Sequence, residues 1–178
     1  WGTVKILAES IAGNGAFQIN PDATLQMEDA VITGYTAVQG LGRIFVPAGK
    51  RLSVEQSGLI DLIDYFAPGM RGTVQCNGLL VVKNAASLAR TAVNVTRAIF
   101  QDNAIITGNV FTTNVMIPYG QVSIENSAIL FNNDVYSKGD RYLDVEPETF
   151  TGAIENNRIF VTVEEGHHLS REAAKQLH

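Results

Sequence analysis

The sequence has little of what most small catalytic and metal-binding sites are made from. Its 178 residues include one cysteine, Cys76, three histidines and one tryptophan. A single cysteine excludes an internal disulfide and a cysteine-rich zinc site. His167 and His168 are neighbours in the chain, and adjacent side chains diverge, so we expect neither a metal site nor a cofactor.

Charge and long apolar segments are scarce as well. Charged residues make up 17% of the chain, the net charge is -5, and the 13 lysines and arginines are scattered singly. Without a basic stripe to neutralise phosphates, a nucleic acid is not an expected partner. The longest apolar runs, such as residues 79–82, hold four or five residues, far fewer than the ~20 that span a bilayer. Membrane insertion is therefore not expected.

What the chain does have is asparagine within a repeated pattern. Of 13 asparagines, 11 lie from Asn77 onward. Residues 27–34 (MEDAVITG) match residues 101–108 (QDNAIITG) closely, and shorter copies of the pattern recur. The central polar residues of the copies, 20 to 30 residues apart, are Asp29, Ser57, Asn77, Asn103, Asn126 and Asn156. Such a period predicts a repeat architecture.

The units contain short β-branched runs broken by glycine and asparagine, which is typical of strands rather than helices. Asparagine tolerates left-handed backbone angles and suits a sharp bend between strands. If successive coils lie ~4.8 Å apart, the amide of one asparagine can donate to the next. The sequence thus predicts a structural ladder of Asn77, Asn103, Asn126 and Asn156. An antiparallel β-sandwich with asparagine-rich turns is the alternative.

These bends, as in residues 100–105 (FQDNAI) and 154–159 (IENNRI), resemble those of right-handed parallel β-helix proteins of the pectate-lyase-like kind. The resemblance implies an all-β, right-handed parallel β-helix of about six coils. We expect an N-terminal lead-in over residues 1–16 that continues from a missing upstream region, and a solenoid domain over 17–163. Residues 164–178 are expected to form a linker and a short C-terminal helix, because Ser170 can cap a run of helix formers.

The resembling proteins include polysaccharide lyases, glycosidases, bacteriophage tailspikes and secreted adhesins, and the fold alone does not choose among them. The resemblance favours a surface-exposed module of a tailspike, tail fibre or adhesin that binds polysaccharide. It also implies a homotrimer and a location outside the cell or on a virion. Two alternatives remain open, a polysaccharide hydrolase or lyase and a structural spacer without a ligand.

If the chain is an enzyme, paired carboxylates are its candidate catalytic groups, because glycosidic cleavage uses acids and bases along a groove. The repeat places Asp102 and Glu125 on neighbouring coils, about 5 Å apart if the copies align. Asp61 and Asp64 form a second acidic pair among apolar residues. Solvated acids at a bend explain the same pattern, so the sequence leaves catalysis undecided.

Ligand binding is predicted in the longest departure from the repeat, where rings and charged groups gather. Aromatic rings suit the apolar faces of sugars, and long loops on a rigid scaffold commonly carry binding surfaces. The candidate ligand-binding residues are Tyr136, Arg141, Tyr142 and Asp144.

Overall fold

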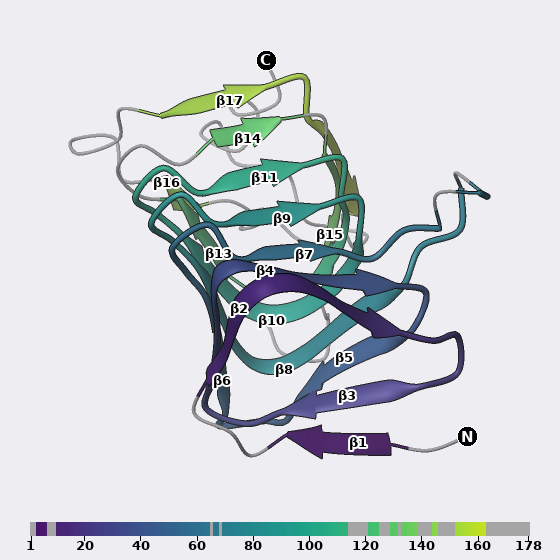
Figure 1. Ribbon diagram of the computed structural model, residues 1–178. Helices are drawn as coiled ribbons and strands as arrows, with labels where there is room; N and C mark the ends of the chain where they lie inside the picture. Colours follow the sequence, from purple (N-terminus) through teal and green to yellow (C-terminus); the bar gives the residue numbers. More distant parts are fainter. Residues whose placement is uncertain are drawn as a thin grey trace.

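The chain is an all-β parallel solenoid, as the sequence predicts. The computed structural model describes residues 3–6, 10–64, 66–67, 69–113, 121–124, 129–131, 133–138, 144–145 and 152–162. All regular elements in these ranges are strands, and every pairing between named strands is parallel. Figure 1 shows the strands stacked along one axis from the N-terminal coils to the C-terminal coils. Parallel pairing excludes the β-sandwich alternative.

Each coil crosses three faces, which we number in the order that the chain visits them. Face 1 contains β1 (Thr3–Ile6), β3 (Thr24–Met27), β5 (Arg43–Val46), the first parts of β8 (Thr73–Val82) and β10 (Ala92–Phe100), β12 (Val110–Thr113), β15 (Asp134–Lys138) and β18 (Arg158–Thr162). Face 2 contains the first parts of β2 (Ser10–Ile19) and β4 (Ala30–Gly40), then β6 (Arg51–Val54), the second parts of β8 and β10, β13 (Gln121–Ile124) and β16 (Asp144–Val145). Face 3 contains the second parts of β2 and β4, then β7 (Leu59–Asp61), β9 (Ser87–Ala89), β11 (Ile105–Thr107), β14 (Ile129–Phe131) and β17 (Ala153–Glu155).

The core lies inside the coils and is built by the period-two alternation of strands. On face 3, Val38, Ile60, Leu88 and Ile106 occupy one register position on successive coils. All four are fully buried. Because parallel register keeps each position on the same side of the sheet, apolar residues stack on apolar residues along the whole axis. Burial of these columns is the main stabilising term.

Left-handed residues turn the chain from face 2 to face 3. The turns at Gln56–Ser57, Asn84–Ala85 and Asp102–Asn103 each hold two residues with φ between 48° and 66°. Such pairs bend the chain sharply within two residues, and asparagine and aspartate tolerate them best among non-glycine residues. Coils with these turns stack directly, since Ala85 N donates to Asp102 O on the next coil (3.0 Å).

An asparagine ladder is present, but it stands at the corner between faces 3 and 1, which we call the ladder corner. Asn109 Nδ2 donates to Asn133 Oδ1 (3.1 Å), and Asn133 Nδ2 donates to Asn157 Oδ1 (2.9 Å). Thr91 N donates to Asn109 Oδ1 (3.0 Å), so Thr91 ends the described ladder. Asn109 and Asn133 are buried, and their amides also donate to carbonyls of the coil below, Leu88 O and Ile106 O.

The three described asparagines among those predicted for the ladder lie at three different corners and therefore do not stack on one another. Asn77 lies within β8 between faces 1 and 2, Asn103 in an exposed turn between faces 2 and 3, and Asn156 at the ladder corner. Asn126 lies outside the described residues. The sequence copies were similar because several corners use the same bend chemistry, and similarity between bends does not say which corner each one occupies.

The first coil of the solenoid includes residues from the segment predicted as a lead-in, and apolar side chains of this coil are exposed. β1 and β2 pair with β3 and β4, so the first coil extends into residues 3–16, the segment expected to be a lead-in. Val4 and Phe17 share register with the buried Leu25 and Val38, yet both are exposed. The predicted C-terminal helix at residues 170–177 lies outside the described residues.

We expect Gly78→Ala to destabilise the fold by about 2 kcal/mol, because a Cβ there would overlap backbone. Gly78 lies between the two parts of β8, where a Cβ would clash with Lys50 O and lie 2.6 Å from Pro47 O. Gly69→Ala is the matched control, since nothing lies within 4 Å of its added Cβ. Urea denaturation measures the stability of both variants. Equal midpoints would show that the backbone of the corner shifts to accommodate the added methyl group.

Candidate functional site

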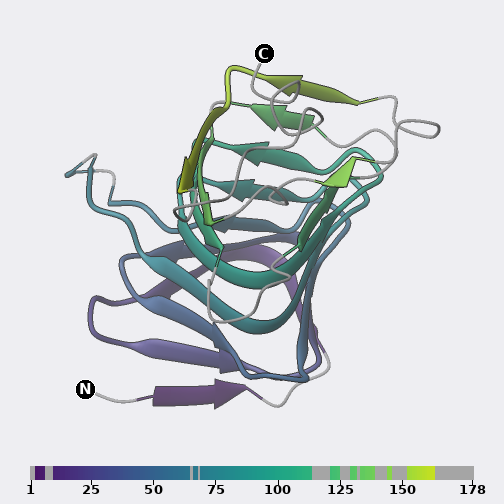
Figure 2. The same cartoon turned by 180° about the vertical axis from the view of Figure 1, so that it is seen from behind.

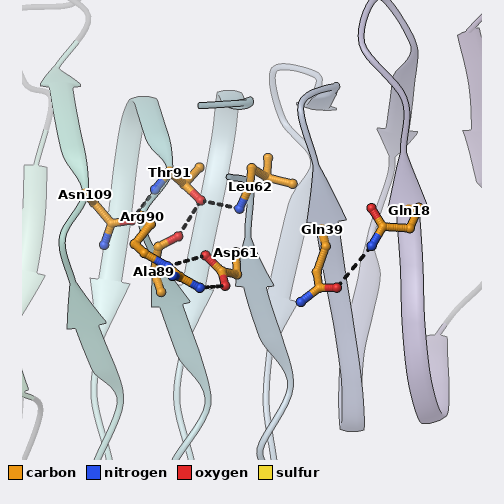
Figure 3. Close-up of polar contacts among 8 residues, drawn as sticks. All are labelled: Gln18, Gln39, Asp61, Leu62, Ala89, Arg90, Thr91 and Asn109. Carbon is orange, nitrogen blue, oxygen red and sulfur yellow. Dashed lines mark hydrogen bonds and ion pairs between the residues drawn. The ribbon is translucent and has the colours of Figure 1, made fainter. Parts of the chain in front are cut away.

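The outer surface of face 3 carries a row of hydrogen-bonding side chains on successive coils, which we call the polar row. Gln18, Gln39 and Asp61 occupy one register position on β2, β4 and β7. Gln18 Nε2 donates to Gln39 Oε1 (3.1 Å). Figure 3 shows the three side chains on adjacent strands. The row points outward because the neighbouring positions, such as Val38 and Ile60, face the core.

Asp61 forms an ion pair with Arg90 from the next coil. Ala89 is the register partner of Asp61, and Arg90 follows it at φ 43°, where the chain turns from face 3 to face 1. Arg90 Nε donates to Asp61 Oδ1 (3.0 Å), and Nη2 donates to Oδ2. The Asp61 side chain is only 3% exposed while that of Arg90 is 42% exposed. A buried carboxylate is thus paired with a partly exposed guanidinium (Figure 3).

A second row of small and apolar residues runs beside the polar row on the same face. Ala37, Leu59, Ser87 and Ile105 share one register position on four successive coils. Leu59 is half-buried and Ile105 is exposed. Face 3 therefore offers an apolar strip next to a hydrogen-bonding strip, both parallel to the solenoid axis.

An arm, described at residues 62–64, 66–67 and 69–72, projects from the solenoid between β7 and β8, at the ladder corner. Its base is closed by a bridge between Ile63 and Arg71 and by Gly72 N donating to Leu62 O (2.8 Å). Phe66 near its end is 99% exposed, and Met70 is also exposed. Figures 1 and 2 show the arm extending sideways from the stack of coils. The polar row therefore ends beside a projecting element.

Arg71, at the base of the arm, reaches two coils along the axis. Its Nη1 donates to Gly108 O, at the corner that follows β11. The residue is exposed, and among the described residues it has no carboxylate partner within 4.0 Å. Arg71, Arg90, Gln18 and Gln39 are the site residues that sequence reasoning missed, because nothing in the sequence places them on adjacent coils.

The predicted catalytic carboxylates that the structure describes each accept a hydrogen bond from another group. Asp61 accepts from Arg90, whereas Asp64 Oδ1 accepts from Phe66 N (2.8 Å) inside the arm. Asp102 lies in a turn between faces 2 and 3 and accepts from Gln101 Nε2 (3.0 Å). Glu125 lies outside the described residues. A catalytic role for either pair stays a prediction.

The single cysteine, Cys76, lies inside the solenoid. It is fully buried in β8 with its side chain in the core. Burial raises the pKa of its thiol to about 11, so the thiol stays protonated and unreactive near neutral pH.

Two of the four predicted ligand-binding residues are described, and they lie on different faces. Tyr136 lies in β15 on face 1, where it pairs with Thr112 and Phe160. Asp144 lies in β16 on face 2. Arg141 and Tyr142 lie outside the described residues. Their grouping as one site stays a prediction.

Charged side chains also gather where faces 1 and 2 meet in the first coils, and they predict a pH dependence. The hydrogen bond from Lys5 lowers the pKa of Glu28, and that from Lys50 lowers the pKa of Asp29. The same bond to Asp29 raises the pKa of Lys50. The carboxylates stabilise the fold above their unfolded pKa, near 4, and this stabilisation is lost as the pH falls below it. The charged Lys50 stabilises the fold below its unfolded pKa, about 10.5, and this stabilisation is lost as the pH rises through its folded pKa.

We therefore expect the temperature of the unfolding midpoint to decrease as the pH is lowered from 6 to 3. Asp29→Asn should lower this midpoint at pH 6 and make it depend less on pH. Asparagine keeps the left-handed backbone of Asp29 (φ 51°), so the variant tests charge rather than bend geometry. Asp22→Asn is a matched control at another left-handed position, where no ion pair is formed among the described residues. An unchanged slope in Asp29→Asn would mean that the ion pair contributes nothing to stability.

Two further observations complete the site. Within the described ranges, no three histidine, cysteine, aspartate or glutamate residues come together as metal ligands, and no helix is long and apolar enough to cross a membrane. In comparisons with known proteins, no family model, no curated protein and no solved structure matches this chain.

Proposed function

We propose that this chain is a surface-exposed β-solenoid module that binds cell-surface polysaccharide, as a part of a phage tailspike, a tail fibre or a bacterial adhesin. The observation that carries the proposal is the polar row of face 3 lying beside the apolar row. Sugars have hydroxyl groups at their edges and apolar ring faces, so paired strips of both kinds suit them. Such a module acts outside the cell or on a virion surface.

Rigidity supports the same proposal. Interstrand hydrogen bonds fix the coils ~4.8 Å apart, so the polar side chains are held in line without being ordered by the ligand. A binding surface that is already ordered loses less conformational entropy on association. A repeating polymer can therefore lie along face 3 and meet Gln18, Gln39 and the Asp61–Arg90 pair in turn.

The test is a panel of bacterial surface polysaccharides, with retention and release of reducing or unsaturated ends measured in parallel. Retention without cleavage supports the binding module, while cleavage would replace it with an enzyme and the absence of both with a spacer. Gln39→Ala should weaken retention about fivefold, the effect of one lost hydrogen bond. Gln75→Ala, on face 1, is the matched control and should leave retention unchanged.

We also propose that the module assembles as a homotrimer, because rods with exposed apolar side chains associate side by side. Phe66 and Met70, both exposed on the arm, are such side chains. Sedimentation equilibrium should give three times the chain mass of 19.3 kDa. A monomer at micromolar concentration would contradict this part of the proposal and leave glycan binding to be judged by the panel.

A further inference from the structure

The ladder corner brings two arginine side chains from different coils to the same glycine. Arg71 Nη1 donates to Gly108 O, from the base of the arm. Arg90 packs against the same residue, since its Cγ lies 3.4 Å from the position that a Cβ of Gly108 would take. Gly108 has φ +64° and lies on the coil that follows Arg90. Arg71 and Arg90 thus both reach Gly108, beside the end of the polar row.

The two arginines differ in how their charge is balanced. Arg90 is paired with the buried carboxylate of Asp61. Arg71 donates to a neutral carbonyl, is exposed, and has no carboxylate within 4.0 Å among the described residues. Asp64, the acid of the arm itself, turns its Oδ1 to Phe66 N instead. Asp61 does not offset Arg71, because its two oxygens accept from Arg90.

The position of Arg71 is fixed rather than free. The bond to Gly108 O holds one end of the guanidinium, and the bridge to Ile63 holds the backbone. A guanidinium has five N–H donors in a rigid fork, and the Nε and Nη2 edge can take both oxygens of a carboxylate. On a chain of net charge -5, a general attraction for anions is absent, so binding of an anion here depends on this local geometry.

We propose that Arg71 is an anion-binding subsite that receives a sugar carboxylate, so that the polysaccharide bound along face 3 is an acidic one. This inference rests on the proposed function and names its ligand class. The neutral hydroxyls of the polymer meet Gln18 and Gln39, and its carboxylate meets Arg71 at the arm. Arg90 is a positioning residue, because it pairs with Asp61 and packs against Gly108, whose carbonyl accepts from Arg71.

A first experiment tests the subsite without any polymer. Sodium glucuronate is titrated into the protein while the Arg71 Nε–H resonance is followed by NMR, with methyl glucoside as the neutral probe. A saturable shift with glucuronate alone is expected. No shift, or an equal shift with sulfate, would overturn the carboxylate assignment whatever the polymer panel shows.

A second experiment uses the polysaccharides of the panel in native and carboxyl-reduced form. Carboxyl reduction and Arg71→Gln should each lower retention at least about tenfold, and the two losses should not add. Arg97→Gln is the matched control, an exposed arginine of β10 on face 2, and should have no effect. Retention that survives both changes would refute the subsite while the proposed glycan binding stands. If the protein retains no polysaccharide of the panel, the proposed function is refuted instead. The glucuronate titration would then still test anion binding at Arg71.

Discussion

Replacing Asn109 by leucine should lower the free energy of unfolding by about 3 kcal/mol. The change removes the acceptor of Thr91 N and the donor to Leu88 O, and both groups stay buried at the ladder corner. The unsatisfied N–H of Thr91 costs about 1–3 kcal/mol, and the lost amide bonds to Leu88 O and Asn133 Oδ1 add to this loss. The apolar side chain of leucine, which has nearly the same shape, cannot compensate, because it points at polar backbone rather than at the core.

The controls separate the ladder from asparagine in general. Asn14→Leu, at an exposed position of β2, should change stability by less than about 0.5 kcal/mol. Asn109→Thr should recover part of the loss, since Thr91 already plays this role one coil earlier, accepting from Leu62 N and donating to Ala89 O. Urea denaturation of the variants decides the matter. Equal midpoints for Asn109→Leu and Asn14→Leu would show that the amide stack does not stabilise the fold.

Removing the guanidinium of Arg90 should be the second most costly change, at about 3 kcal/mol for Arg90→Met. The substitution leaves the Asp61 carboxylate, 3% exposed, without its ion-pair partner. Breaking a buried pair from one side costs about 3–5 kcal/mol, because an uncompensated charge remains out of water. Methionine keeps the aliphatic stem, so the loss reports on the charge.

Removing the charge of Asp61 instead should lower the free energy of unfolding less than removing that of Arg90. Asp61→Asn leaves a guanidinium that is 42% exposed and can be hydrated. The double variant Asp61→Asn/Arg90→Met should also be more stable than Arg90→Met alone, because the buried charge is gone. Thermal denaturation of the three variants gives the order. A double variant that is less stable than Arg90→Met would contradict a buried-charge origin of the loss.

Part of the candidate site could be read from the sequence, and part could not. Asp61 stood out as an acid among apolar residues, and the structure places it in the polar row. Its partner Arg90 is 29 residues away, with no motif linking the two. Gln18 and Gln39 carry no signal of their own, since a lone glutamine in a strand is ordinary. Only the stacking of coils turns these residues into neighbours.

The misplaced ladder has the same origin. Asn109, Asn133 and Asn157 are 24 residues apart, but Thr91 precedes Asn109 by 18 and follows Leu62 by 29. The arm of residues 62–72 and the turns of different length change the number of residues per coil without disturbing the stack. A sequence alignment that matches similar bends cannot detect this, because bends at all corners need left-handed residues and therefore share composition.

The sequence by itself determined the architecture of this protein. Short β-branched runs, a repeat of 20 to 30 residues and asparagine at the bends leave few alternatives to a stack of strands, since each run can bury its apolar side only against the next coil. Tertiary structure decided which residues share a corner or a face. That choice depends on the register between coils, which is set by the apolar columns inside and by ladder bonds such as Asn109 to Asn133. Both interactions join residues far apart in the chain, so no local pattern contains them.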